Sequence, residues 1–332
     1  MTQLSNKDHF ASIMPGRTRF IRGRSVSGRD RISKPTPSPT GASLEGFAFV
    51  FPALALFGVF ILYPAFYICY ASFFDWDGVN PGVFIGAKNF YHIFNDDEHF
   101  WSAMRNILFW VPLNIVPQMM LGFLIAFLLE IKTRAVPVFR VLFYLPAIIS
   151  PVVIGMIWQR IYNPFGGLLS GLGIATGLDF LTFPFLANPQ TAIFAVIVVN
   201  IWQWMGFSML MYVAGMKGIS GEILEAARLD GITTWQTALY VVWPMLRHVH
   251  LTLILLGVLD ALQSFTLIYI MTKGGPNHAS EMLPTHIFRQ GFELQNMGYA
   301  SALSVVLLVM ALGLSIFQVR VIGARFSFGG RK

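Results

Sequence analysis

Long uncharged runs constrain the fold of this chain more than any other feature. The first of them, residues 46–74, contains no Asp, Glu, Lys or Arg over 29 consecutive positions. A helix needs about 20 apolar residues to cross the hydrocarbon core of a bilayer. A cleaved signal peptide has a shorter apolar region close to the N-terminus, whereas this run follows a long polar segment. The run therefore predicts a membrane-spanning helix.

Comparable apolar runs recur along the rest of the chain. Charged residues make up 12% of the sequence and the mean hydropathy is +0.62, whereas soluble domains carry about 25% charged residues. We therefore predict an all-α polytopic membrane protein with six transmembrane helices. The expected spans are residues 46–74, 104–129, 141–160, 190–216, 248–271 and 297–319.

Lys and Arg residues are unevenly distributed among the connecting segments. Eighteen of the 23 lie in the N-terminal tail, in residues 131–140, in residues 217–247 and at the C-terminus, and the other segments hold five. Because basic residues favour the cytoplasmic side of a membrane, we expect a protein of the cell membrane with both termini and the segment 218–247 in the cytoplasm. The net charge of +7 then reflects orientation, and no nucleic-acid partner is predicted.

The segments outside the spans are too short to form another sizeable domain. Residues 1–45 are polar and basic, with alternating prolines after Lys34, a composition that predicts a disordered cytoplasmic tail. Residues 46–322 are expected to form one membrane domain, followed by a short cytoplasmic tail at 323–332. Cys69 is the only cysteine, which excludes a disulfide within the chain and a multi-cysteine metal site. No metal or cofactor is predicted.

The segment Ser220–Pro244, here called the elbow, is an amphipathic island between two apolar spans. Ser220 is placed to cap a first helix, and Gly231 suits the left-handed position just beyond the end of that helix. Thr233 and Gln236 form the sequence pattern of a capping box for a second helix. The elbow is therefore predicted to be a helix, a break and a helix, and to contact another molecule.

A few polar side chains within the predicted spans are candidates for a solute path. Asp260 is the one acidic residue in the middle of a span, where an ionisable group is costly and usually functional. Gln263 and Ser264 follow three and four residues later, so a continuous helix would place them on the same face as Asp260. A packing hydrogen bond from Asp260 to Asn200 or Gln203 is the structural alternative.

A second polar group lies in the predicted span 190–216. Asn200 and Trp204 combine an amide with an aromatic ring, and this pair of groups suits the hydroxyls and the C–H face of a sugar. No Lys or Arg lies deep in any predicted span, which favours a neutral solute over a strongly anionic one. Asn200, Trp204, Asp260, Gln263 and Ser264 are therefore the predicted solute-path residues.

The elbow resembles the cytoplasmic loop of permease subunits from binding-protein-dependent ATP-binding-cassette (ABC) importers. The family pattern is E-A-A, three residues, G, nine residues and I-x-L-P. Glu225, Ala226, Ala227, Gly231 and Pro244 match that pattern in register. Val241 and Trp243 stand at the positions of its Ile and Leu.

Other parts of the chain resemble the carbohydrate type of these permeases, whose members serve maltose, lactose and glycerol-3-phosphate. The resemblance covers residues 46–322 and is closest to the subunit that pairs with a second, similar permease. Its further points are Asn89-Phe90, Phe100-Trp101, Arg105-Asn106, Tyr162-Asn163-Pro164, Gly166 to Leu169, Met271 to Pro276 and Gly298 to Ala302.

The resemblance implies a type I ABC importer transmembrane domain with several partners. These are a second permease, two ATPase subunits below the membrane and an extracytoplasmic solute-binding protein above it. It implies that Glu225, Ala226, Ala227, Asp230, Gly231 and Pro244 couple the permease to an ATPase, with Glu225 pairing with a basic group and Asp230 bracing the turn. Because the chain contains no G-x-x-x-x-G-K-[ST] motif, we expect the partner to hydrolyse ATP, so the chain itself is no enzyme.

Three other functions stay open at this point. The first is the same class of importer acting on glycerol-3-phosphate or another polar ester, which the lack of basic residues within the spans disfavours. The second is an ion-coupled transporter that works without an ATPase. Such a transporter does not need the elbow, so the elbow disfavours this function. The third is a membrane enzyme, which needs more catalytic groups at membrane depth than Asp260 alone.

Overall fold

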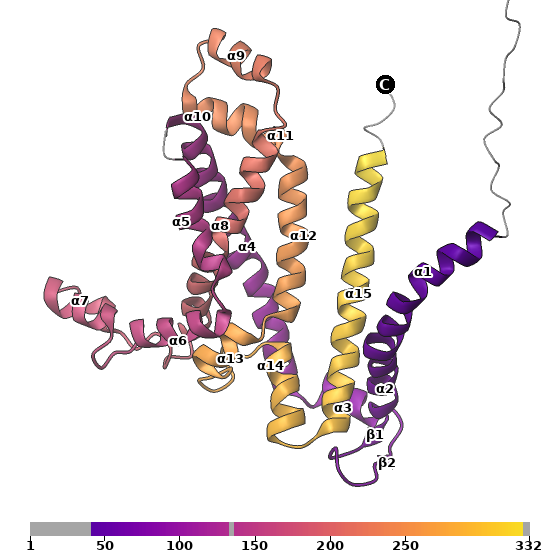
Figure 1. Cartoon of the computed structure of the whole chain (residues 1–332). Coiled ribbons are helices and arrows are strands. Elements are labelled where there is room, and N and C mark those ends of the chain that lie inside the picture. The colour runs from indigo at the N-terminus through magenta and orange to yellow at the C-terminus, as the bar shows by residue number, and fades with distance from the viewer. Residues whose placement is uncertain (1–40, 133–135, 328–332) are drawn as a thin grey trace, which may run out of the picture. The chain divides into compact units, whose positions relative to one another are not determined.

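The computed structural model describes residues 41–132 and 136–327 (Figure 1). The predicted tails at 1–45 and 323–332 therefore lie largely outside the described residues. The chain divides into two compact units at Phe57. Of the first unit, the structure describes only α1 (Gly41–Phe57), an apolar helix with Pro52 inside it.

The second unit, residues 58–332, is almost entirely helical. Its longest helices are α4 (Glu98–Lys132), α8 (Ala192–Met216), α12 (Arg247–Gln263) and α15 (Met297–Ser327). The shorter elements are η1 (Gly58–Leu62), α2 (Tyr63–Ala71), β1 (Phe74–Asp75), β2 (Val83–Phe84), α3 (Lys88–Asn95), α5 (Val136–Ile148), α6 (Pro151–Ile161), α7 (Leu168–Thr176), η2 (Asp179–Thr182), α9 (Gly221–Leu229), α10 (Thr234–Gln236), η3 (Thr237–Val242), α11 (Trp243–Met245), α13 (Thr266–Thr272), α14 (Leu283–Phe288) and η4 (Arg289–Glu293).

Four helical stretches are long and apolar enough to cross a membrane. They are Gly46–Ala71, Glu98–Glu130, Ala192–Met216 and Met297–Gln318, which agree with the first, second, fourth and sixth predicted spans. Two further pairs of helices are bent at a short break: Pro137–Ile148 with Pro151–Ile161, and Thr234–Met245 with Arg247–Gln263. The count is six if each of these pairs forms one span. In the first stretch, Pro64 follows the π-helical turn η1, where a proline cannot continue the regular hydrogen-bond pattern.

The third span, predicted as one helix over 141–160, is instead two helices, α5 and α6, that meet at 93°. Ser150 adopts an extended conformation (φ −54°, ψ 131°), and Pro151 begins α6. Proline disfavours the helical region for the residue before it and has no N–H to donate. The prediction of a continuous helix was therefore wrong, and the cause is visible in the sequence at Pro151.

The fifth span, predicted as one helix over 248–271, is also interrupted. The helix α12 ends at Gln263, and Ser264 is extended with ψ 99°. Asp260 and Gln263 thus share a helix, but Ser264 does not continue it, so the expected common face of all three was wrong. Beyond the break, Gln159 on α6 donates to the carbonyl of Ile270 on α13 at 2.6 Å, which attaches α13 to α6.

Close helix packing builds the core of the second unit. On α4, a Cβ added at Gly122 would lie 2.5 Å from Cβ of Ser208 on α8, so only glycine permits this approach. Nearby, the amide of Asn200 donates to Asn114 across the same helix pair at 3.1 Å. These contacts fix α4 against α8 and leave neither amide unpaired in the core.

A buried polar cluster joins several elements at the end of the bundle opposite α9 (Figure 1). We call it the distal network, and it consists of Asp97, His278, Glu281, His286, Arg289 and Tyr299. One oxygen of Asp97 caps α4 by accepting from the backbone N–H of His99 and Phe100 at 2.9 and 3.0 Å. Its other oxygen accepts from Nε2 of His286 at 2.8 Å and from the hydroxyl of Tyr299 at 2.5 Å.

Glu281 is the second carboxylate of the distal network and is fully buried. It accepts from the guanidinium of Arg289 and bonds Nδ1 of His278 at 2.5 Å. Nδ1 of His286 lies 3.6 Å from a Glu281 oxygen. The amide of Asn106 donates to the backbone carbonyls of Ala279 and Glu281. The network therefore ties the start of α4 to the segment 278–289 and to α15.

The electrostatics of the distal network favour a charged His286. Burial alone would lower the pKa of its ring, but the hydrogen bond to Asp97 and the negative charge of nearby Glu281 outweigh burial and raise that pKa to about 8. Burial would raise the pKa of both carboxyls, yet the bonds that they accept hold each pKa below its ordinary range. The pairing of buried charges thus stabilises the charged form of each group.

This shift in the pKa of His286 predicts a pH-dependent stability. Because its pKa is about 8 in the folded protein and near 6.5 when unfolded, the contribution of His286 is complete below pH ~6.5 and is lost as the pH rises through 8. Its size is on the order of 2 kcal/mol. Thermal unfolding of the purified protein in detergent should therefore show His286→Gln less stable than wild type at pH 6.5, with the difference shrinking by pH 9.

The exposed His248 provides the control for this measurement. His248→Gln should unfold like the wild type throughout the pH range. A His286→Gln deficit that does not change between pH 6.5 and 9 would contradict the assignment of a charged imidazole held between Asp97 and Glu281.

Candidate functional site

The elbow has the predicted architecture of a helix, a break and a second helical segment. The first helix is α9, and α10, η3 and α11 follow after the turn, at one end of the bundle (Figure 1). Ser220 occupies the N-cap position with an extended backbone, but its hydroxyl makes no capping hydrogen bond. The position predicted for Ser220 is therefore confirmed, and the predicted side-chain cap is not.

The turn between the two helical segments is set by its backbone. Gly231 has φ +72°, and a Cβ added there would meet no atom within 4 Å. The left-handed backbone, not packing, is thus the reason for glycine at this position. The capping box is confirmed, since Thr233 N–H donates to Gln236 at 2.7 Å and Gln236 N–H donates to the Thr233 hydroxyl at 3.3 Å.

The second half of the elbow is firmly attached to the bundle. The ring of Trp243 lies 4.8 Å from that of Phe123 on α4 and 4.1 Å from that of His250 on α12. His250 contacts the Tyr212 hydroxyl at 2.8 Å and the carbonyl of Trp243 at 2.9 Å. The imidazole of His250 therefore links α8, α11 and α12.

Pro244 lies in α11, three residues before α12 begins. It is exposed and follows the six-residue π-helical segment η3. Because proline has no N–H, it cannot donate the regular helical bond at its position. The helical segments on either side of Leu246 meet at 69°, so Pro244 stands close to the bend where the elbow joins α12.

The first half of the elbow is, by contrast, mostly exposed. In α9 only Ala227 is buried, whereas Glu225, Ala226 and Asp230 just beyond the helix are exposed. The Asp230 carboxylate accepts no hydrogen bond from any described residue, so the expected bracing of the turn is not seen. Leu229 is 89% exposed. A single exposed leucine is common on protein surfaces and does not by itself mark an interface.

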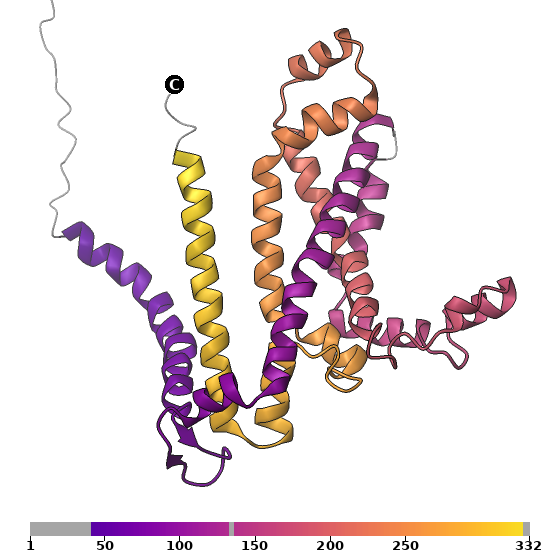
Figure 2. The same cartoon turned by 180° about the vertical axis from the view of Figure 1, so that it is seen from behind.

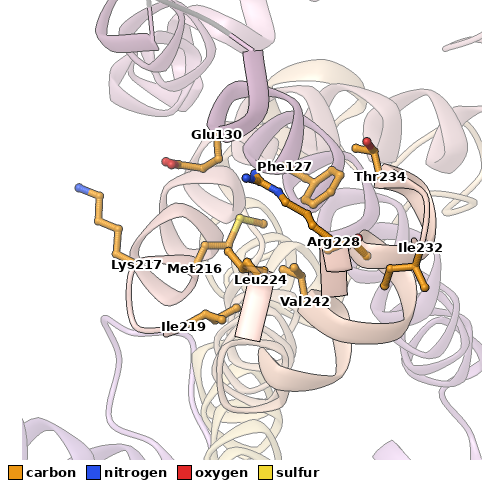
Figure 3. Close-up of a pocket in the computed structure, with 11 residues that line it drawn as sticks. Phe127, Glu130, Met216, Lys217, Ile219, Leu224, Arg228, Ile232, Thr234 and Val242 are labelled. Atoms are coloured by element: carbon orange, nitrogen blue, oxygen red, sulfur yellow. The ribbon is translucent and has the colours of Figure 1, made fainter. Parts of the chain in front are cut away.

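A cavity lies between α9 and the bundle (Figure 3). Its volume is about 280 Å³. It is lined by Phe127, Glu130, Met216, Lys217, Ile219, Leu224, Arg228, Ile232, Thr234, Thr237 and Val242. The helix α9 therefore does not pack tightly on α4 and α8, and space remains beneath it.

The predicted solute-path residues occupy two different environments. Asn200 is buried and paired with Asn114, and Gln203 is buried with its amide 3.5 Å from the carbonyl of Ile149. Asp260 and Gln263 are exposed on α12. The alternative that Asp260 bonds Asn200 or Gln203 is therefore wrong. Trp204 is partly buried on α8, and within the described residues no side-chain hydrogen bond joins it to Asp260.

The fold and the exposed elbow define a class of membrane protein, the permeases with the type I ABC importer fold. The chain belongs to the family described as binding-protein-dependent transport system inner membrane components, whose sequence profile matches residues 118–325. It is accordingly a permease subunit of a binding-protein-dependent importer and a multi-pass membrane protein. This family comprises membrane components and not the ATPases of these systems.

Individual relatives agree with this membership. The chain is 36% identical over 277 residues to the probable ABC transporter permease protein YurN of Bacillus subtilis, which covers 82% of this chain and 94% of YurN. It is 33% identical over 279 residues to the diacetylchitobiose uptake system permease protein NgcF of Streptomyces coelicolor, which covers 80% of this chain and 78% of NgcF.

A solved structure agrees on the fold. It is the crystal structure of a bacterial alginate ABC transporter in complex with an alginate pentasaccharide-bound periplasmic protein. One of its chains matches with a TM-score of 0.73 and 22% identity, over 84% of this chain and 94% of that one.

The positive φ of Gly231 generates a direct prediction for transport. A β-branched side chain is strongly disfavoured in the left-handed region, so Gly231→Val should displace α9 and lower solute uptake at least fivefold without preventing membrane insertion. Uptake by cells that express equal amounts of each variant measures this. Gly221→Val, at the start of α9 and without a positive φ, is the control and should retain most uptake. Equal uptake by both variants would contradict the role of the turn.

Proposed function

We propose that this chain is one half of the translocation path of an ATP-driven importer for a sugar or a related polyol. It pairs with a second, similar permease, two ATPase subunits bind from the cytoplasm, and an extracytoplasmic solute-binding protein delivers the solute. The elbow carries this proposal, because its second half is bonded into the bundle while its first half presents an exposed helix. ATP hydrolysis belongs to the partner subunits, since the sequence has no nucleotide-binding motif.

The orientation of the chain in the membrane follows from the same proposal. Residues 46–322 act as one permease domain with six spans if each bent pair of helices crosses the membrane once. An even number of crossings leaves both termini on one side. The distribution of Lys and Arg favours the cytoplasm for that side and for the elbow, in the inner or plasma membrane of the cell.

The coupling residues are those of the family pattern in the elbow. Glu225 is exposed on α9 and pairs with a basic group of the ATPase, a charge-assisted contact that gains strength when partly desolvated. Ala226 and Ala227 permit a close approach of α9 to its partner. Gly231 and Pro244 lie at the two ends of the rigid second half of the elbow. Asp230 belongs to the exposed surface next to the turn.

The solute path is proposed to run past the break in the fifth span. Asp260 and Gln263 are exposed at the end of α12, directly before the extended Ser264. Non-helical backbone at membrane depth is tolerated only where it is buried in protein or lines a water-filled cavity, and interrupted helices form the solute sites of many transporters. Asn200 and Trp204 are the candidates contributed by α8.

A sugar or polyol is the preferred solute on two grounds. Relatives of this chain include the diacetylchitobiose permease NgcF and the multiple sugar-binding transport system permease MsmF of Streptococcus mutans. In addition, neither α8 nor the part of α12 beyond Arg247 contains Lys or Arg. A phosphate ester such as glycerol-3-phosphate usually requires a basic group, which makes it the second candidate.

Reversal of the charge at Glu225 tests the coupling role. Glu225→Lys should place a cation against the basic group of the ATPase, so that at least tenfold less ATPase co-purifies with the permease and uptake is lost. Glu222→Lys, an equally exposed acidic position in α9, is the matched control and should keep most of the bound ATPase. Normal binding by Glu225→Lys would refute the docking contact.

Substitutions on α12 test the solute path. Asp260→Ala and Gln263→Ala should each lower solute-stimulated ATP hydrolysis or change which solute stimulates it, because both remove hydrogen-bonding groups beside the break. Thr252→Ala, exposed on the same helix, should behave like the wild type. If stimulation and specificity are unchanged in both α12 variants, these residues do not contact the solute.

A further inference from the structure

Glu130, at the end of α4, is the acidic residue on the wall of the cavity beneath α9. Its carboxylate accepts from the guanidinium of Arg140 on α5 at 2.5 Å. Both side chains are partly exposed, at 36% for Glu130 and 25% for Arg140. A partly solvated ion pair of this kind contributes little to stability, so Glu130 can change partner without disturbing the core.

Arg228 is the second cation that can reach Glu130. It is the basic residue of α9, and its side chain lines the same cavity. Figure 3 shows its guanidinium extending from α9 across the cavity toward the wall that carries Phe127 and Glu130. In the part of the chain that the structure describes, Arg228 forms no salt bridge.

The helix α9 is free to approach α4. Only Ala227 of this helix is buried, although Leu224 also packs against the core, and the cavity of about 280 Å³ leaves space between the rest of α9 and the bundle. Gly231 forms a turn with open space around it. Trp243, His250 and Tyr212 hold the second half of the elbow against the bundle. A force on α9 therefore moves that helix about the turn at Gly231 and into the cavity.

We propose that Glu130 exchanges Arg140 for Arg228 when an ATPase subunit presses α9 into the cavity. Arg228 is then a positioning residue that holds the elbow in its displaced state, while Arg140 holds Glu130 in the resting state seen here. Because one carboxylate serves two guanidinium groups of similar chemistry, the two arrangements differ little in free energy. The nucleotide state of the ATPase therefore decides between them.

This proposal rests on the proposed function, since it requires an ATPase that contacts α9. It adds that the contact is transmitted to the ends of α4 and α5 through Glu130. Loss of cavity volume also removes water from the new pair, which strengthens the attraction between Arg228 and Glu130 relative to a solvated pair.

Disulfide trapping in the assembled importer tests the approach of α9 to position 130 that the exchange requires. In a Cys69→Ser background, one variant carries Glu130→Cys with Arg228→Cys, and the other carries Glu130→Cys with Arg140→Cys. The first pair should form a disulfide at least fivefold faster when the ATPase is trapped with ATP and vanadate than without nucleotide. The second pair joins α4 and α5, which the proposal leaves in place, and should form its disulfide at a similar rate in both nucleotide states. Rates that are independent of nucleotide for both pairs would overturn the exchange.

Functional variants separate a positioning role from a merely structural one. Arg228→Gln should lower the solute transported per ATP hydrolysed at least threefold while the ATPase still co-purifies, and Arg228→Lys should restore most of that ratio. Lys217→Gln, which removes a cation from the same cavity lining, is the matched control and should leave the ratio unchanged. If Arg228→Lys is as defective as Arg228→Gln, or if Lys217→Gln is equally defective, the charge of Arg228 is not what positions α9.

Failure of the proposed function gives a different result from failure of the exchange. If no ATPase co-purifies with the wild-type chain, both the coupling role and the exchange are overturned. If the ATPase co-purifies but neither disulfide pair responds to nucleotide, the exchange alone is wrong, and the ATPase binds without bringing α9 closer to Glu130.

Discussion

The need to pair every backbone N–H and C=O group inside a bilayer governs this structure. Long helices meet that need within themselves, and α4, α8 and α15 do so over most of their length. The two interruptions, at Ser150 and Ser264, therefore carry information. At the first, Pro151 removes a donor and bends the chain by 93°. At the second, Gln159 bonds the carbonyl of Ile270 just beyond the break, so the interruption is supported by a neighbouring helix.

The two halves of the elbow differ in how firmly they are held, and this difference gives the chain its mechanism. Trp243 and His250 bond the second half to the bundle, whereas α9 stands over a cavity with a single buried residue. A partner that displaces α9 therefore bends the chain at Gly231, while the second half of the elbow stays attached to the bundle. At the other end of the bundle, the distal network joins α4, α14 and α15 through paired buried charges. When the elbow moves, these helices therefore remain joined at the end that lies away from the elbow.

Much of this arrangement could be predicted from sequence, and the residues explain which parts. The long uncharged runs predicted the spans, and local chemistry predicted the elbow, because Gly231, Thr233 and Gln236 act on their immediate neighbours. The predicted third span did not include the break at Ser150, although Pro151 disfavours a helical conformation at the residue before it. The break at Ser264 has no proline or glycine to predict it, and α13 beyond it packs on α6, a contact between residues far apart in the sequence. The distal network was missed because Asp97 and His286 are 189 positions apart and neither lies in a recognisable motif.

The central claim is that the chain transports solute only as part of an ATP-driven assembly that a binding protein feeds. The most direct test is uptake of radiolabelled sugar into proteoliposomes that contain the permease pair and the ATPase. We predict that uptake requires ATP on the ATPase side and solute-loaded binding protein on the opposite side. The Glu225→Lys variant should show no uptake. Uptake driven by an ion gradient, in vesicles that contain this chain without ATPase or binding protein, would contradict it.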